Sequence, residues 1–327
     1  MTRKSLIICV FFAILALLPV VSDDSYIRHV SIVALLYAIV VSGWNVSLGF
    51  GGVFNFAHLA FFAIAAYATG ILTKTYGFPS WMGVPIGIIA AVIASLIVCL
   101  PVLRLKGIYV ILVTFGFGQL CLQFVLNQRS LTGGNFGFVQ IPPLRVFGYS
   151  FRSDQAMGYY YLALVGLILT VVLINWFRSS PFGWRVAALR ENEDYAVSRG
   201  IALARVRLAT FAFSAIFPGA AGAIYAQYVR AASPDMFGFS FLTIALSMLL
   251  LGGVATVWGP VVGALVFAIL TEVMTPLGPG RYLVTAVLIV AILRFFPKGL
   301  AGIPDGLATW RARSRKIDPA KGHGPNV

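Results

Sequence analysis

The sequence predicts an all-α protein, a polytopic transmembrane helix bundle of about 8–10 spans with interrupted helices at glycine-rich segments. Three observations support this prediction. Of the 327 residues, 60% are hydrophobic and only 10% are charged, and the mean hydropathy is +0.92, whereas about 25% of residues in soluble domains are charged. Apolar runs long enough to cross a bilayer recur along the chain. Glycine clusters break two of these runs.

The apolar runs set the domain organisation. Seven of them have the length of a span, at 5–21, 28–48, 54–73, 82–103, 107–127, 158–177 and 206–229. Residues 240–275 are apolar but contain glycines and a proline, so they could form two short helices or one broken helix. A last, short run covers 281–295. We expect a single transmembrane domain over residues 1–305 and a basic tail over 306–327.

The basic residues indicate how the chain is oriented. There are 24 Lys and Arg against 10 Asp and Glu, a net charge of +14. With about ten passes and the N-terminus inside, the outer side receives only Arg28, Lys74, Arg129, Arg145, Arg152, Arg230 and Arg281. The other basic residues fall in cytoplasmic segments, which is the bias that membrane proteins show. Both termini are therefore expected in the cytoplasm, and the charge does not indicate nucleic-acid binding.

Residues 1–21 leave two possibilities open. The basic start and the apolar run also resemble a secretory signal peptide, but no small-residue cleavage site of the alanine type follows. We expect the segment to be retained as a first span. In either case residues 22–28 lie outside.

A polar segment, residues 177–207, interrupts the apolar pattern. It holds six arginines and three of the ten acids. Pro181 can open a helix and Gly200 can stop one, so the segment is predicted to present a charged helical surface to a partner. Glu193 is interpreted as a docking and helix-capping group. Because no histidine or cysteine lies near its acids, acid–base catalysis is a weaker interpretation than an exposed helix.

Two glycine-rich apolar stretches, 43–70 and 249–269, predict interrupted helices in the bundle interior. Broken helix at membrane depth is tolerated only where protein or a water-filled cavity covers the backbone. Paired breaks indicate a transport path between two halves, although helix packing through small residues is an alternative explanation. The residues predicted to line the path are Asn45, Gly49, Gly51, Gly52, Asn55, His58, Gly252, Gly253, Gly259 and Pro260. A lone Asn or His at this depth more often ties two helices together.

The sequence lacks the residues that several kinds of chemistry require. The phosphate-loop pattern GxxxxGK[ST] is absent from the sequence, so the chain cannot be its own ATPase. The three histidines lie at unrelated depths and the three cysteines lie in apolar runs, so no metal site or disulfide framework is predicted. No cofactor is expected to bind this chain. No chain of acids suited to a proton relay runs through the spans.

Five motifs together resemble a known family. They are LGFGGVFNFAHLAFFAIAAYATGIL, LRLKGIYVILVTFGFGQL, LTGGNFGF, RENEDYAVSRGI and LLLGGVATVWGPVVGA. In this order and spacing, over roughly residues 30–298, they resemble the permease subunits of branched-chain amino acid ABC importers. The second and third motifs, with an extra N-terminal span, are similar to the LivM type of the two homologous permease subunits.

The resemblance implies a multi-pass permease of the bacterial inner membrane that works by alternating access. Its implied partners are a homologous second permease, two cytoplasmic ATPase subunits that carry ATP and Mg, and an extracytoplasmic solute-binding protein near residues 128–157. It also makes 177–207 a coupling loop that docks on the ATPase. The coupling residues implied are Arg185, Arg190, Glu191, Glu193, Ala196 and Gly200. Relatives commonly have paired small residues where this chain has Tyr195, Ala196 and Val197, so the loop pattern is met only in part.

Other functions remain open at this point. Within the same family the solute could be a branched-chain amino acid, another small amino acid, urea or a short amide. A membrane-embedded lipid-modifying enzyme would use the charged cluster at 190–194 and act without partners. A facilitator or channel would carry solute without an ATPase, but it would leave the polar loop without a role.

Overall fold

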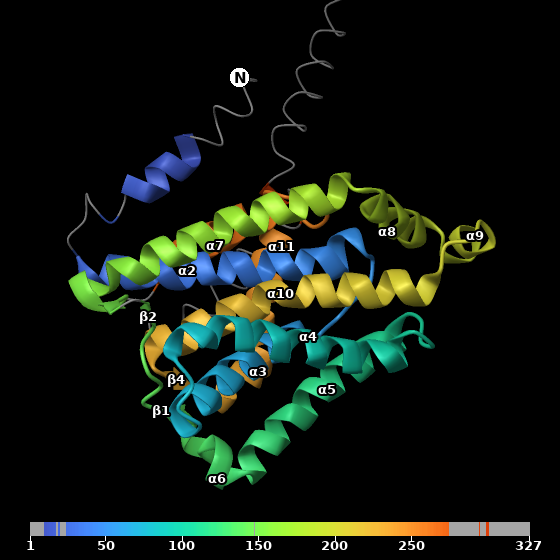
Figure 1. Ribbon diagram of the computed structural model, residues 1–327. Helices are drawn as coiled ribbons and strands as arrows, with labels where there is room; N and C mark the ends of the chain where they lie inside the picture. The colour runs from blue at the N-terminus through green and yellow to red at the C-terminus, as the bar shows by residue number, and fades with distance from the viewer. Residues whose placement is uncertain are drawn as a thin grey trace, which may run out of the picture.

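The computed structural model describes residues 10–17, 19, 24–146, 148–274, 294, 299 and 300. Almost all regular structure in these residues is helical, which confirms the all-α class (Figure 1). Five segments are long and apolar enough to cross a membrane: Ser25–Phe50, Ser80–Val102, Ile108–Asn127, Ala156–Ser179 and Leu203–Val229. The predicted run at 281–295 lies almost entirely outside the described residues, and the predicted tail at 306–327 lies wholly outside them.

The long helices and their short companions follow one another with few strands. The helices are α2 (Ser25–Asn45), α3 (His58–Gly70), α4 (Gly83–Val102), α5 (Ile108–Asn127), α6 (Arg129–Thr132), α7 (Ser153–Ser179), α8 (Pro181–Glu191), α9 (Glu193–Ser198), α10 (Leu203–Val229), α11 (Phe239–Gly252) and α12 (Gly259–Val273). Shorter turns of helix are the π-helical η1 (Val46–Phe50) and η2 (Ile71–Thr75), and the 3₁₀ segments η3 (Ser80–Met82), η4 (Gly134–Phe136) and η5 (Pro234–Phe237). Residues 10–17 are also helical.

Helix α10 lies at the centre of the bundle and packs against α2, α3 and α4. Small residues make these close approaches possible. A Cβ on Gly219 would meet the Ile88 backbone of α4 at 2.9 Å, and one on Gly222 would overlap the Phe62 carbonyl of α3. Without a hydrophobic force between helices in lipid, such van der Waals contact through glycine and alanine is a main source of association.

The two ends of the bundle carry different segments. At one end, called the α8–α9 end here, the 103–107 loop meets α9, where Lys106 pairs with Asp194. The other end, called the strand end, gathers residues 71–82, 128–152 and 230–238 (Figure 1). These segments contain five of the basic residues that the charge count places outside, Lys74, Arg129, Arg145, Arg152 and Arg230.

Short strands hold the strand end together. Strand β1 (Phe138–Val139) pairs antiparallel with β4 (Ala231–Ala232), and β2 (Arg145–Val146) forms a hairpin with β3 (Tyr149–Ser150). The Lys74 amine donates a hydrogen bond to the Val139 carbonyl at 2.8 Å. The β1–β4 pair and the Lys74 hydrogen bond therefore tie Phe138 and Val139 to the rest of the bundle.

Both predicted interruptions are present. Helix α2 continues into η1 and then breaks, and Gly52 has φ +67°. In the second stretch, α11 and α12 are two short antiparallel helices, and the chain reverses direction between them at 253–258, where Gly253 has φ +109°. Positive φ is accessible to glycine without the steric cost that a side chain brings. The glycine clusters thus mark the points where the chain must turn.

Candidate functional site at the α8–α9 end

The polar segment folds as two short helices. The Ser180 side chain caps α8 by accepting a hydrogen bond from the Gly183 amide at 3.1 Å, and Pro181 is its first residue. Proline suits this position because its fixed φ is helical and its missing N–H would have no partner there. The prediction that Pro181 opens a helix is confirmed.

The segment is not one continuous helix, because it breaks at Asn192. There the backbone is extended, and the Asn192 side chain accepts a hydrogen bond from the Tyr195 amide at 3.0 Å. Asn192, and not Glu193 as the sequence interpretation had it, is therefore the cap of α9. Gly200, with φ +88°, follows the end of α9, so the predicted stop is confirmed. The Ile201 amide bonds back to the Ala196 carbonyl, which closes the turn.

Most of this surface is open to solvent and mixes charged with aromatic groups. The exposed charged, aromatic and apolar side chains include Trp184, Arg185, Arg190, Glu191, Tyr195, Val197 and Arg199. The Trp184 side chain is 71% exposed, and Tyr195 is 58% exposed. By contrast, Ala196 is only 3% exposed, so it faces the protein interior. Exposed aromatic and arginine side chains are the types that protein interfaces favour. We call this set the α8–α9 surface.

The Glu193 side chain points toward its own chain. It pairs with Arg207 of α10 and with Lys106, whose amine lies 3.6 Å away. Lys106 also bonds to Asp194 at 3.2 Å, and this hydrogen bond together with the two carboxylate charges raises the pKa of Lys106 above its ordinary value. The Glu193 side chain is 21% exposed and that of Arg207 14%, so their pair is partly desolvated. Glu193 thereby fastens α9 to α10 and to the 103–107 loop.

A cavity of about 830 Å³ lies between α8 and the 253–258 turn. Its lining comes from the end of α7, from α8, from η1 and from the turn, and it includes Trp184 and Arg190. Arg190 also touches the first interrupted helix, since a Cβ on Gly52 would meet the Arg190 Cγ at 2.8 Å. A residue predicted for coupling and one predicted for the path are therefore in contact.

Asn45 joins the two glycine stretches. Its amide nitrogen donates to the Thr256 carbonyl at 2.7 Å, and its oxygen accepts from the Ala255 amide at 2.9 Å. The Asn45 side chain is only 1% exposed. Gly49 lies against the same contact, because a Cβ there would overlap the Asn45 oxygen and meet the Ala255 nitrogen at 2.7 Å. The two stretches thus meet through one bidentate side chain.

Asn55 and His58 are wholly buried in the interior. The Asn55 oxygen accepts from the Ala57 amide at 3.0 Å, while its amide nitrogen has no hydrogen-bond partner within the described residues. The His58 Nε2 lies 3.1 Å from the Val40 carbonyl, and its ring stacks on Trp44 at 5.9 Å. These contacts tie α3 to α2. Gly51 ends η1, and a Cβ there would meet the Ser47 carbonyl at 2.6 Å.

The second glycine stretch forms the crossing of α11 and α12. A Cβ on Gly252 would overlap the Gly259 carbonyl, and one on Gly263 would meet the Gly252 Cα at 2.7 Å. Pro260 occupies the first turn of α12, where no helical N–H is required. Gly253 also lies close to Gly299, because a Cβ added to Gly299 would lie 2.5 Å from the Gly253 Cα. The glycines allow backbones to touch at the turn.

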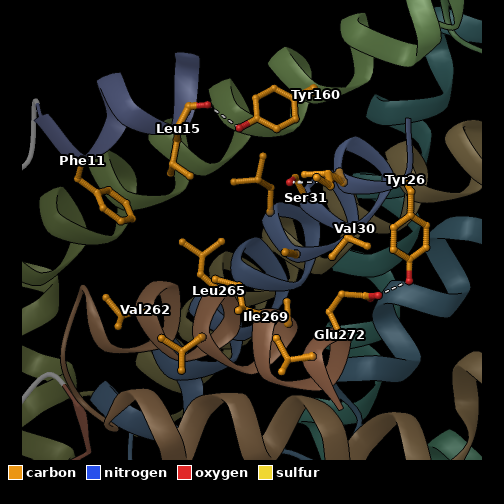
Figure 2. Close-up of a pocket in the computed structure, with 16 residues that line it drawn as sticks. Phe11, Leu15, Tyr26, Val30, Ser31, Tyr160, Val262, Leu265, Ile269 and Glu272 are labelled. Atoms are coloured by element: carbon orange, nitrogen blue, oxygen red, sulfur yellow. Dashed lines mark hydrogen bonds between the residues drawn. The ribbon is translucent and has the colours of Figure 1, made fainter. Parts of the chain in front are cut away.

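An apolar groove of about 500 Å³ opens on another side, between residues 10–17, α2 and α12 (Figure 2). At its edge the Tyr26 hydroxyl donates a hydrogen bond to the Glu272 carboxylate. This bond links the start of α2 to the end of α12, and it gives the Glu272 carboxylate a hydrogen-bond partner. The groove itself is lined almost entirely by aliphatic and aromatic side chains.

Sequence reasoning missed several of these contacts. Asn192 was identifiable, because asparagine is among the preferred N-caps. Lys106 and Arg207 gave no such signal, since their pairing with Glu193 depends on how distant segments pack. In the part of the chain that the structure describes, no three His, Cys, Asp or Glu residues gather as a metal site.

Comparisons with known proteins agree with this architecture. A family described as "Branched-chain amino acid transport system / permease component" matches residues 26–293. LivM, a permease protein of the high-affinity branched-chain amino acid transport system of Escherichia coli, is 30% identical over 292 residues, which cover 83% of this chain and 69% of LivM.

More distant relatives are also transport permeases. LivH of Salmonella typhimurium is 25% identical over 293 residues, covering 82% of this chain and 92% of LivH. The galactose/methyl galactoside import permease MglC of the same species is 26% identical over 207 residues, covering 62% of this chain and 59% of MglC. No solved structure matches the chain. These relatives are permeases and not enzymes, and the chain belongs to the family of permease components of branched-chain amino acid transport systems.

Proposed function

We propose that this permease subunit of an ABC importer moves branched-chain amino acids across the bacterial inner membrane, driven by ATPase subunits that dock on the α8–α9 surface. The proposal places that surface in the cytoplasm and the strand end outside. A homologous second permease completes the membrane unit, and a solute-binding protein docks at the strand end, where residues 128–157 lie.

The observation that carries the proposal is a continuous series of contacts from the α8–α9 surface to the glycine breaks. Arg190 lies on that surface and rests its aliphatic stem on Gly52. A few residues before Gly52, Asn45 is bonded to the 253–258 turn. A displacement of α8 by an ATPase would therefore press on the chain at Gly52 and reach the second stretch through the hydrogen bonds of Asn45. Arg185 and Glu191, exposed on α8 with Arg190, and Gly200, at the end of α9, belong to this docking role.

Rigid elements suit such a transmission. Glu193 ties α9 to α10 through its ion pair with Arg207. Helix α10 in turn packs on α2, α3 and α4. The cavity between α8 and the turn leaves room for the two to approach during alternating access.

The solute assignment rests on the family. LivM and LivH are named for branched-chain amino acid transport, whereas MglC is named for galactose import. Permeases of related sequence thus serve different solutes, and the partner that captures the solute contributes to selection. Uptake of labelled leucine, isoleucine and valine, against urea and acetamide, should be measured in cells with and without this chain. Loss of urea or acetamide uptake alone would refute the amino acid assignment.

The docking role is tested with a matched pair of tryptophans. Trp184 is 71% exposed on α8, and Trp176 is 66% exposed on α7, outside the α8–α9 surface. Replacement of a buried interface tryptophan by alanine costs about 2 kcal/mol or more, roughly a thirtyfold weaker association. Trp184→Ala should reduce ATPase co-purification and ATP-dependent uptake, and Trp176→Ala should leave both near normal. Equal retention of the ATPase by both variants would refute docking on this surface.

A further inference from the structure

The cavity between α8 and the 253–258 turn carries charge of one sign. Its volume of about 830 Å³ falls within the range of about 300–1,000 Å³ that small-molecule sites have. Two arginines line it, Arg178 from the last turn of α7 and Arg190 from the last turn of α8. None of its described lining residues is acidic. The cavity therefore suits an anionic ligand.

The positive charge of the cavity is not neutralised by the described part of the chain. The side chains of Arg178 and Arg190 are exposed, and neither makes a hydrogen bond or an ion pair within the described residues. The nearby acids Glu193 and Asp194 are paired with Lys106 instead. A ligand can therefore reach both guanidinium groups.

The position of Arg178 along α7 places it at the level of lipid headgroups. The apolar segment Ala156–Ser179 has 24 residues, a length of about 36 Å that exceeds a hydrocarbon core of about 30 Å. Arg178 is the last residue but one of this segment. Trp176, two residues earlier, is 66% exposed, and tryptophan is enriched where the membrane meets water. The Arg178 guanidinium thus lies near the phosphates of the surrounding lipid.

The rest of the lining suits the remainder of a phospholipid headgroup. Beside Arg178 on α7, Asn175 and Ser179 add an amide and a hydroxyl, and Phe50 and Val257 add apolar surface. A guanidinium group can donate two parallel hydrogen bonds to the oxygens of a phosphate. A zwitterionic headgroup would also bring an ammonium group, for which the described lining has no carboxylate. The chemistry therefore favours a lipid whose headgroup is anionic.

The termini of the chain do not complement the cavity. Residues 1–9 contain Arg3 and Lys4 and no acid, and residues 306–327 contain five Lys or Arg and one Asp. Both carry the same sign of charge as the cavity. Basic pockets between membrane helices at the cytoplasmic side bind anionic lipid headgroups in other proteins.

We propose that this cavity binds an anionic phospholipid, phosphatidylglycerol in type, with its phosphate between Arg178 and Arg190. The inference goes beyond the proposed function and needs from it only that the α8–α9 end lies at a membrane surface. Because the stem of Arg190 rests on Gly52, the bound headgroup would be held beside the first interrupted helix.

Photochemical cross-linking tests the site. The assembled importer is placed in phosphatidylcholine vesicles with a trace of phosphatidylglycerol that carries a photoactivatable group on its headgroup. After illumination, peptide mapping should find the label on residues 175–190 and 255–258. Arg178→Gln should reduce this label about tenfold, the effect of a charge-assisted hydrogen bond. Arg178→Lys, which keeps the charge but loses the planar fork, should reduce it less.

The control is Arg104→Gln, which removes an exposed arginine from the same end of the bundle but outside the cavity lining. It should leave the label unchanged. Label that is absent from the cavity segments, or equal in the wild type and Arg178→Gln, overturns the inference.

Competition identifies the source of the phosphate. Excess unlabelled phosphatidylglycerol should remove the label, and soluble glycerol phosphate should not. Displacement by soluble glycerol phosphate would assign the cavity to a free phosphate compound and overturn the lipid assignment. The cross-link needs neither solute nor ATP, so a failure of ATP-dependent leucine uptake would refute the proposed function without changing this result.

Discussion

The contact between the two glycine stretches gives a quantitative prediction through Asn45→Ala. The substitution removes two hydrogen bonds and leaves the Ala255 amide and the Thr256 carbonyl without their partner. Asn45 is 1% exposed, so water does not replace it directly. An orphaned buried polar group costs about 1–3 kcal/mol, and two of them give a loss of about 2–6 kcal/mol in the free energy of unfolding.

The assay compares Asn45→Ala with Ser42→Ala in detergent-solubilised protein. Ser42 lies less than a turn earlier on the same helix, is equally buried, and its hydroxyl has no hydrogen-bond partner within the described residues. Its removal should change the melting temperature little or raise it, because a buried hydroxyl without a partner is itself unfavourable. Asn45→Ala should lower the melting temperature by several degrees. ATP-dependent uptake should fall in parallel.

A second substitution tests whether the same contact is responsible. Gly49→Ala would place a methyl group against the Asn45 oxygen and 2.7 Å from the Ala255 nitrogen, so it should disrupt the same hydrogen bonds. Its effect and that of Asn45→Ala should therefore be less than additive in the double variant. Full additivity, or a loss in Asn45→Ala no greater than in Ser42→Ala, would refute the assignment of Asn45 as the link.

Three further predictions concern the helix crossing and the coupling loop. Gly263→Val should prevent stable folding, because its side chain would meet the Gly252 Cα at 2.7 Å. The control Gly118→Ala makes only an ordinary contact at 3.7 Å and should fold. Equal yields of the two variants would count against the close crossing of α11 and α12. In a double-mutant cycle, Glu193→Gln and Arg207→Gln should show a coupling energy of about 1–3 kcal/mol, because the pair is partly buried. A coupling energy near zero would show that the ion pair does not hold α9 to α10. Gly200→Ala should destabilise the end of α9 by about 1 kcal/mol, because residue 200 has a φ of +88°. The measurement is hydrogen exchange, which should become faster only for the amides of α9. Unchanged exchange would contradict a requirement for glycine at this position.

Some features of the loop were predictable because their causes are local. Pro181 opens α8 and Gly200 follows the end of α9, as expected from the conformations that proline and glycine favour. The break at Asn192 has an equally local cause, a side-chain cap, although the sequence interpretation did not identify it. The interpretation of Glu193 as the cap was wrong because its carboxylate is drawn to two cations from other segments.

In the glycine stretches, too, the features with local causes were predictable and the contacts between distant segments were not. The sequence predicted two breaks, and the breaks occur at Gly52 and Gly253, where the backbone adopts positive φ. It could not predict that Asn45 would reach across to the 253–258 turn, because the partners are separated by more than 200 residues. We predicted that a lone Asn or His ties two helices together, and the hydrogen bonds of Asn45 and His58 do link separate segments.

The sequence by itself determined the class, five of the long spans and the positions of the breaks. Each of these follows from hydropathy or from local backbone preferences. Only the tertiary structure decided which segments meet: Arg190 with Gly52, Glu193 with Arg207, and Asn45 with the turn before α12. The physical reason is that in a bilayer nearly every face is apolar, so hydropathy cannot distinguish a face that packs on protein from one that meets lipid.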